Sequence, residues 1–409
     1  MEEWKYIKIS ELCEKVCSGG TPKSTISAYY GGNIPWLNTK EIDFNRIYKT
    51  EKNITQEGLD NSSAKWIEEN SVIVAMYGAT AGKCAISKIP LTTNQACCNL
   101  MIDKTVADYR YVYYALYNDY VKLSSLANGG AQQNLNAQQI KDFNVPYREL
   151  KEQKIIANLL SSLDGKIALN KRINDNLEQQ AQALYKSWFV DFKPFKDGGF
   201  IDSELGEIPE GWRVGKLSDI GKIVGGSTPS KKHHEYYTTN GIAWLTPKDL
   251  SITGAKFTSR GEIDITEIGY KSCSTKMLPR GSVLFSSRAP IGYISIALND
   301  ICTNQGFKSI VPNKEVGTAF VYYYLKNNTS KIESQASGST FKEASGSLIN
   351  SLPIVIPPVK LISKFNEIAN PIFSQQEKNE EEIKKLSQLR DSVLPKLMSG
   401  ELKINDLHS

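Results

Sequence analysis

The chain of 409 residues contains one unusual phrase twice, and this internal repeat is the strongest constraint on its fold. The string SGGTPKSTISAYYGGNIPWL covers residues 18–37, and GGSTPSKKHHEYYTTNGIAWL covers residues 225–245. In each copy a Thr-Pro turn precedes a Tyr-Tyr pair and a Trp-Leu pair, while the residues between the proline and the tyrosines differ. Shared residue pairs in the same order, separated by residues that differ, predict two copies of one domain.

The parallel between the copies continues downstream. SVIVAMYGATAGK (71–83) matches SVLFSSRAPIGY (282–293), TNQA (93–96) matches TNQG (303–306), and YRYVYYALYND (109–119) matches AFVYYYLKNN (319–328). Short β-branched runs at 71–75 and 282–285 lie between Gly, Pro and Asn turns, and helices are expected around 109–126 and 318–333. Each copy is therefore predicted to be a mixed α/β domain, within an α+β chain.

Two other segments have apolar residues spaced three and four apart, which is typical of a long amphipathic helix. They cover residues 150–190 and 359–400, and each would be roughly 60 Å long at 1.5 Å per residue. Gly165 weakens the first helix by roughly 1 kcal/mol without ending it, and Pro371 is expected to start or kink the second. Two narrow apolar stripes of matched length are most simply buried against each other as a coiled coil.

The stripes are defined by every third or fourth residue of each segment. They contain Ile156, Leu159, Leu163, Ile167, Ile173, Leu177, Ala181, Leu184 and Trp188 in the first segment, and Phe365, Ile368, Ile372, Ile383, Leu386, Leu389, Val393 and Leu397 in the second. The predicted organisation is a first domain at 1–149, a long helix at 150–190, a linker at 191–211, a second domain at 212–358, a second long helix at 359–400 and a tail at 401–409.

Features of catalysis and of metal binding are missing. No phosphate-binding glycine motif follows a strand, and three histidines give poor material for a catalytic triad. Seven scattered cysteines form no C-x-x-C pair, so no metal site is expected. Glu-x-Lys triplets at 149–151, 382–384 and 401–403 are expected by chance in a charged chain. A net charge of +5 is compatible with a polyanionic partner without requiring one.

The doubled motifs, with helix endings SWFVDFKPF and LRDSVLPKLMSGEL, closely resemble the specificity (S) subunit of type I restriction–modification systems, over essentially the whole chain. The resemblance implies a non-catalytic subunit with two target-recognition domains, each reading one half of a split, asymmetric sequence of double-stranded DNA. A cytoplasmic location is expected separately, because MEEWKYIKIS shows no secretory signal and no run approaches eighteen apolar residues. It also implies an antiparallel coiled coil with pseudo-twofold symmetry, which docks two methyltransferase subunits and the restriction subunits. S-adenosylmethionine, ATP and Mg are then expected in those partners, and no cofactor in this chain.

DNA contacts are expected where the two copies diverge, because residues that read different words must differ. The candidates lie in the loop after the Thr-Pro turn, in the glycine-rich stretch at 76–83 with its counterpart at 286–293, and in the loops before the long helices. Solvated surface loops and a tight turn are the alternative interpretation. The candidate DNA-binding residues are Lys23, Ser24, Thr25, Tyr77, Thr80, Lys83, Gln132, Gln133, Lys231, Lys232, His233, Arg288 and Lys342.

Arg288 has the geometry to bond guanine bidentately or to clamp a phosphate. The Asn-Gln pairs at 94–95 and 304–305 are identical in both copies, so they are predicted to brace the fold rather than to read bases, and Trp36 is predicted to be a core aromatic. Candidate positions for docking partner subunits are Leu163, Ile167, Leu177, Leu184, Ile383, Leu386, Leu389 and Val393.

Two functions from other classes stay open at this point. One is a coiled-coil protein scaffold without DNA specificity, whose domains bind only protein. The other is a cryptic nuclease, with Asp142 and Glu149 as the acidic residues to test.

Overall fold

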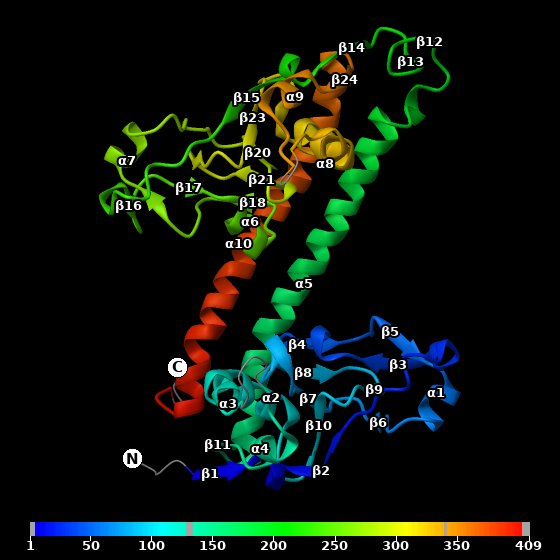
Figure 1. Ribbon diagram of the computed structural model, residues 1–409, viewed down its shortest axis with the longest axis vertical. Coiled ribbons are helices and arrows are strands. Elements are labelled where there is room, and N and C mark those ends of the chain that lie inside the picture. Colours follow the sequence, from blue (N-terminus) through cyan, green and yellow to red (C-terminus); the bar gives the residue numbers. More distant parts are fainter. Residues whose placement is uncertain (1–4, 128–133, 339–341, 403–409) are drawn as a thin grey trace. The chain divides into compact units, whose positions relative to one another are not determined.

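The computed structural model describes residues 5–127, 134–338 and 342–402 (Figure 1). It is a mixed α/β chain with two long helices, and it divides into two compact units. The first unit comprises residues 1–167 and 384–409, and the second comprises residues 168–383. Each unit therefore contains one copy of the repeat together with part of each long helix.

The first unit is built on a five-stranded sheet with the order β2-β10-β7-β8-β4 and a four-stranded sheet with the order β5-β3-β9-β6. A separate pair, β1 with β11, is antiparallel. The strands are β1 Lys5–Lys8, β2 Cys13–Ser18, β3 Tyr30–Leu37, β4 Asn45–Ile47, β5 Lys52–Ile54, β6 Trp66–Ile67, β7 Val72–Ala75, β8 Cys84–Ser87, β9 Leu91–Thr93, β10 Cys97–Ile102 and β11 Asn144–Tyr147. The short helices are α1 Gln56–Asp60, α2 Tyr109–Asn118, α3 Tyr120–Ser125 and α4 Ala137–Lys141.

The second unit has a five-stranded sheet with the order β15-β23-β20-β21-β18 and four two-stranded pairs: β12–β13, β14–β24, β16–β19 and β17–β22. The strands are β12 Phe200–Ile201, β13 Ile208–Pro209, β14 Arg213–Lys216, β15 Gly221–Gly225, β16 Tyr237–Thr238, β17 Trp244–Leu245, β18 Phe257–Thr258, β19 Asp264–Ile265, β20 Val283–Ser287, β21 Ile291–Ala297, β22 Cys302–Thr303, β23 Lys308–Pro312 and β24 Pro353–Ile356. The short helices are α6 Pro247–Thr253, α7 Glu267–Lys271, α8 Gly317–Gln335 and α9 Gly346–Ser351.

The two five-stranded sheets follow the same order of sequence motifs. In both, the last strand joins through a parallel pairing, β4 with β8 and β18 with β21, while the pairings between the other neighbours are antiparallel. The Trp-Leu pair of each copy lies in a strand that is parallel to the strand before the Asn-Gln pair, β3 with β9 and β17 with β22. The markers that repeat in the sequence thus occupy matching positions in the two sheets.

The long helices are α5 Leu150–Phe189 and α10 Val359–Ser399, and both are continuous. Gly165 lies inside α5 without ending it. The expectation that Pro371 would start the second helix is wrong, because α10 begins after the Pro357-Pro358 pair, where the Pro358 carbonyl accepts the Leu361 amide at 2.8 Å. The helix expected at 109–126 is two helices, α2 and α3, which meet at Asp119.

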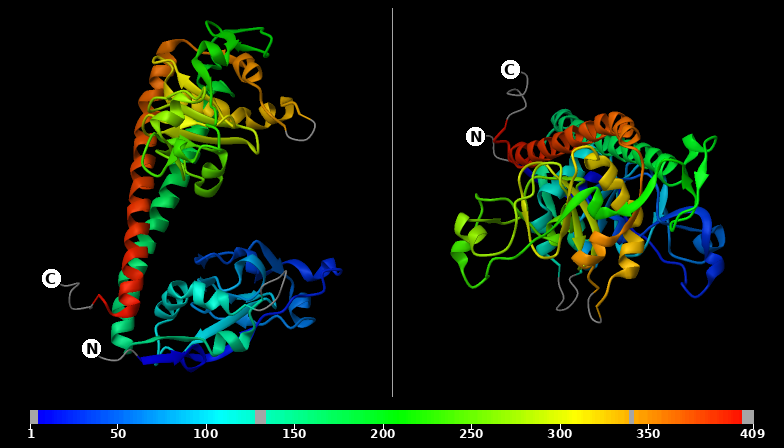
Figure 2. Two further views of the ribbon diagram at one scale, coloured as in Figure 1. Left: turned by 60° about the vertical axis from the view of Figure 1, so that its left-hand side comes forward. Right: turned by 90° about the horizontal axis from the view of Figure 1, so that it is seen from above.

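Within each unit, α5 and α10 lie side by side in antiparallel directions (Figure 2). In the first unit, the Arg390 guanidinium bonds Asp164. In the second unit, the Asn170 amide donates to Glu382 at 2.8 Å, and the Asn174 amide donates to the Gln376 carbonyl at 3.1 Å.

The predicted apolar stripes are only partly correct. Ile173, Ile368 and Leu389 are 37%, 46% and 48% exposed, whereas the amide residues Asn170, Gln376 and Asn379 are at most 4% exposed. The reason is that amides bond across the helix pair in the second unit, where Asn379 donates to the Asn174 side chain at 2.7 Å. A spacing rule counts apolar residues and does not detect a buried amide layer.

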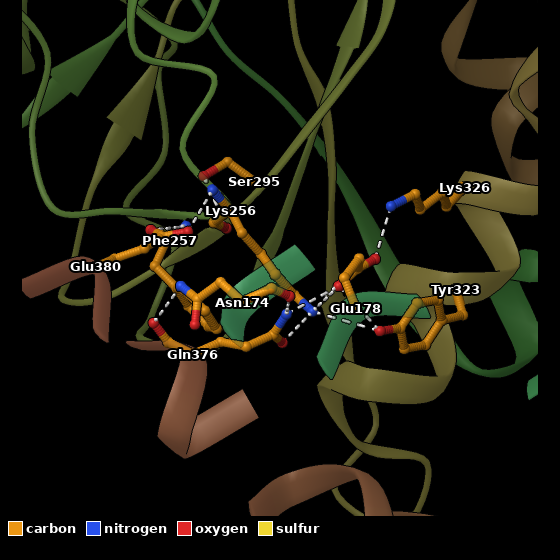
Figure 3. Close-up of polar contacts among 9 residues, drawn as sticks. All are labelled: Asn174, Glu178, Lys256, Phe257, Ser295, Tyr323, Lys326, Gln376 and Glu380. Atoms are coloured by element: carbon orange, nitrogen blue, oxygen red, sulfur yellow. Dashed lines mark hydrogen bonds and ion pairs between the residues drawn. The ribbon is translucent and has the colours of Figure 1, made fainter. Parts of the chain in front are cut away.

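In the second unit a largely buried carboxylate on α5 joins this helix to α8, to α10 and to the segment before β18 (Figure 3). Glu178 accepts from the ammonium groups of Lys256 and Lys326, each at 2.6 Å. It also accepts from the Tyr323 hydroxyl at 3.1 Å and from the Gln376 amide at 3.2 Å. Burial alone would raise the pKa of Glu178, but the two ammonium groups outweigh it and lower the pKa to about 2.

The first unit uses a carboxylate of α5 in a similar way. Asp164 accepts from the Tyr114 hydroxyl of α2 at 2.6 Å and from the Arg390 guanidinium of α10 at 2.9 Å. Arg46 of β4 lies 3.4 Å from the same carboxylate. In both units, therefore, one acidic side chain of α5 bonds a sheet cation, a tyrosine and a polar side chain of α10.

We expect Glu178→Gln to lower the free energy of unfolding by about 3 kcal/mol at neutral pH, because two lysines would lose a buried partner. Glu267→Gln is the matched control, because Glu267 is 78% exposed in its pair with Lys271 and such surface pairs contribute about 0–1 kcal/mol. Urea unfolding of the full chain measures both.

The pH dependence gives a second readout of the same change. Because the folded-state pKa of Glu178 lies below its ordinary value of 4.5, its ion pairs stabilise the fold above that pH and are lost as the pH falls toward 2. The stability difference between wild type and Glu178→Gln should therefore shrink below pH 4.5. A difference that is independent of pH would contradict this role.

Candidate nucleic-acid interface

The repeated phrase forms a braced turn in the first unit. The Trp36 indole donates to the Gly20 carbonyl at 2.9 Å, and the Tyr30 hydroxyl donates to the Pro22 carbonyl at 2.7 Å. The Thr21 hydroxyl bonds the Gln95 side chain. The turn is thereby fixed to β3 and to the Asn-Gln segment after β9.

The second unit repeats this brace bond for bond. The Trp244 indole donates to the Ser227 carbonyl at 3.1 Å, the Tyr237 hydroxyl donates to the Pro229 carbonyl at 2.6 Å, and Thr228 bonds Gln305. Trp36 and Trp244 are only 4% and 6% exposed, respectively. The shared aromatic and glutamine residues thus stabilise the turn, as the sequence predicts.

A glycine is required where the turn crosses the Asn-Gln segment. A Cβ atom on Gly19 would lie 2.1 Å from the Thr93 carbonyl oxygen, and one on Gly226 would lie 2.1 Å from the Asn304 carbonyl oxygen. These are backbone atoms that a side chain could not displace without moving the strand. The close approach explains why each copy keeps a glycine at this point of the phrase.

The variable residues follow the braced turn and lie on the surface. In the first unit the Ile26 amide donates to the Lys23 carbonyl at 3.1 Å, and in the second the His233 amide donates to the Ser230 carbonyl at 3.2 Å. The two loops therefore share a backbone turn although their side chains differ. The exposed side chains are Lys23, Ser24 and Thr25 in one loop, and Lys231, Lys232 and His233 in the other.

In the glycine-rich stretch of the first unit, the candidate residues differ in exposure and in their partners. Tyr77 is 44% exposed and Thr80 is half-buried. Lys83 is bound to Asp43, with its ammonium 2.6 Å from the carboxylate. A phosphate contact by Lys83 would therefore have to break this ion pair.

A cavity of about 700 Å³ in the second unit brings several candidates together. Lys231 and Arg288 line it, with Trp244 and Asn304 of the brace. It also includes Lys248, which the sequence-based candidate set omits. The signal for Lys248 was present, because a Lys-acid pair follows the Trp-Leu pair in both copies.

The remaining candidate residues for DNA binding and for partner docking differ in exposure. Lys342 is exposed, whereas Gln132 and Gln133 lie outside the described residues. Of the candidate docking positions, Ile167 is buried and Leu389 is exposed. The half-buried docking positions are Leu163, Leu177, Leu184, Ile383, Leu386 and Val393.

Within residues 5–127, 134–338 and 342–402, no group of three or more His, Cys, Asp or Glu side chains is arranged to hold a metal ion. Over the same residues, no helix has the length and apolar character needed to cross a bilayer.

The comparisons with known proteins agree on one class. The family model for the type I restriction modification DNA specificity domain matches residues 1–179 and again residues 209–388. A type I restriction enzyme specificity subunit (MjaIX) of Methanocaldococcus jannaschii is 30% identical, over 99% of this chain and 95% of its own length. The HindI specificity subunit of Haemophilus influenzae is 24% identical, over 98% of this chain and all of its own.

A solved structure supports the fold. The crystal structure of a type I restriction–modification S subunit from M. genitalium covers 97% of this chain and 96% of its own, with a TM-score of 0.63 and 16% identity. The class defined by fold and sequence is thus a DNA sequence-recognition protein. The chain belongs to the type I restriction–modification specificity subunit family.

We expect Trp244→Phe to loosen the variable loop of the second unit, because the Ser227 carbonyl would lose its indole donor. A net hydrogen bond of this kind contributes about 1 kcal/mol. The measurement is amide hydrogen exchange, which should accelerate at His233 and Tyr236. Trp66→Phe is the control, since Trp66 is 46% exposed, and unchanged protection at His233 in Trp244→Phe would contradict the bracing role.

Proposed function

We propose that this chain reads a split, asymmetric DNA target for a type I restriction–modification complex, with one short word read by each copy of the repeat. The observation that carries the proposal is the contrast between the residues that brace each turn and the residues of the loop that follows it. The side chains that form the brace are the same in both copies, whereas the exposed residues of the loop that follows each turn differ. Two readers of different words need this combination of a constant scaffold and variable contacts.

The long helices are proposed to set the number of unread base pairs between the two words. They have 40 and 41 residues, or roughly 60 Å at 1.5 Å per residue, while one turn of DNA is roughly 34–36 Å. Their antiparallel packing within each unit is what a pseudo-twofold coiled coil between two recognition domains requires. A spacer of this length is of the right order for a gap of one DNA turn.

The chemistry is proposed to belong to partner subunits. Two methyltransferase subunits would dock on the helices, using positions such as Leu177 and Leu386, and restriction subunits would join them. S-adenosylmethionine, ATP and Mg would be bound by those partners, and this chain would supply recognition without a catalytic step. Its substrate would be double-stranded DNA in the cytoplasm.

The decisive experiment is a methylome of cells that express the chain with its methyltransferase partner. We expect modified adenines in a split motif, with two short words across a fixed gap. Replacing residues 1–149 by another reader should change one word only. A stable complex with an active methyltransferase but no split motif would favour the protein-scaffold alternative, and a change in both words would contradict independent reading.

We expect Lys231→Ala combined with Lys232→Ala to weaken DNA binding by the assembled complex at all sequences. If both lysines contact phosphates, the slope of log K against log salt should fall in magnitude by about 2. Lys314→Ala combined with Lys331→Ala removes two other exposed lysines of the same unit and should leave the slope unchanged. An unchanged slope in the Lys231 and Lys232 variant would place both side chains in solvent.

A further inference from the structure

One surface position has the same backbone environment in both copies and a different side chain in each. The chain pairs Tyr77 with Asn134 in the first unit and Arg288 with Glu343 in the second, each through an isolated antiparallel bridge. The position is therefore fixed by the fold, while its chemistry changes from a phenol to a guanidinium.

The backbone bonds beside this position also match. The Leu135 amide donates to the Met76 carbonyl at 2.7 Å, and the Ala344 amide donates to the Ser287 carbonyl at 2.9 Å. In addition, the Ser287 amide donates to the Gly306 carbonyl at 2.7 Å, next to the Asn-Gln pair of the brace. Arg288 thus projects from a hairpin end that is tied to the braced turn.

The Arg288 guanidinium has a carboxylate beside it. Its Nη1 lies 3.5 Å from Glu343, whose other oxygen lies 3.2 Å from the Lys308 ammonium. Lys308 is largely buried, with a side chain 17% exposed, whereas the Arg288 side chain is 36% exposed. The Lys308 ammonium therefore holds the Glu343 carboxylate in place. Glu343 can in turn orient the Arg288 guanidinium toward the cavity, which Lys231 and Asn304 also line.

This environment favours a neutral ligand over a phosphate. Glu343 offsets part of the positive charge of Arg288 and Lys308, so this cluster attracts a phosphate less than two free cations would. Phosphates are also the same in every DNA word, so a phosphate clamp has no reason to be tyrosine in the other copy. A guanine edge carries no charge, and its O6 and N7 atoms accept two hydrogen bonds from one guanidinium.

We propose that Arg288 is the specificity-determining residue of the second copy and that it reads a guanine, with Glu343 as its positioning residue. The inference rests on the proposed function, because it assigns one base contact within that function. Tyr77 occupies the matching position in the first copy, where it cannot make the same bidentate contact. The two words should therefore differ at the bases that face these two residues.

The test uses the assembled methyltransferase complex and compares the methylomes of wild type, Arg288→Lys, Arg288→Ala and Glu343→Gln. Arg288→Lys keeps the charge but loses the planar fork. We expect it to relax one guanine position in one word by roughly tenfold or more, with the other word unchanged. Arg288→Ala should relax the same position at least as much, and Glu343→Gln should relax it less.

Lys248→Ala provides the matched control. Lys248 lines the same cavity, but it is paired with Glu262 at 3.1 Å and its side chain is 70% exposed. It should lower overall methylation without altering base preference. Co-elution of each variant with its methyltransferase partner in gel filtration confirms that it is folded and assembled.

The outcomes separate the inference from the proposed function. A wild-type methylome without a split motif would overturn both. A split motif whose base preferences survive Arg288→Lys and Arg288→Ala, with only a smaller salt slope in Arg288→Ala, would show a phosphate clamp and overturn the guanine assignment alone. Relaxation at one guanine in the variants supports it, and relaxation in both words would overturn it.

Discussion

Two carboxylates on α5, the buried Asp164 and the largely buried Glu178, hold the elements of each unit in register. An unpaired charge in such a place costs several kcal/mol, so each carboxylate needs its cations at fixed positions. Asp164 has Arg390 of α10 at 2.9 Å, and Glu178 has Lys256, the residue before β18, at 2.6 Å. Helix sliding or sheet rotation would separate these groups. The ion pairs therefore make the helix–sheet arrangement specific in a way that apolar packing alone would not.

A series of contacts connects the variable loop to the long helices. The position of the loop therefore depends on how firmly the sheet is attached to the helices. Within the second unit, α8 packs on the five-stranded sheet and provides Tyr323 to Glu178. The Asn-Gln segment lies between β22 and β23, and β23 is a strand of this sheet. Gln305 of that segment bonds the turn that carries the variable loop. Each step is a hydrogen bond or a buried contact, so the loop backbone is set by the fold. What differs between the copies is limited to side chains at the surface.

The sequence was sufficient for the features that depend on local spacing or on comparing the chain with itself. The identity of the Asn-Gln pairs in the two copies predicted the bracing role of Gln95 and Gln305, and three-and-four spacing predicted both long helices. It was insufficient where partners are far apart in the chain. Lys256 and Glu178 are 78 residues apart, and Arg288 and Glu343 are 55 apart, so no local pattern relates them. The amides of Asn170 and Asn379 were missed because the stripe rule assigns polar residues to solvent.

The division between braces that are the same in both copies and exposed loops that differ explains how one scaffold can serve two words. A substitution at Lys231 or Arg288 changes a side chain at the surface, and it leaves the Trp244 and Tyr237 hydrogen bonds in place. Changes of this kind away from core and brace usually alter stability by no more than about 0.5 kcal/mol. A change at Trp244 or Gly226, by contrast, would move the backbone that presents the loop. Recognition can therefore diverge between the copies at little cost in stability, provided that the residues of the brace are kept.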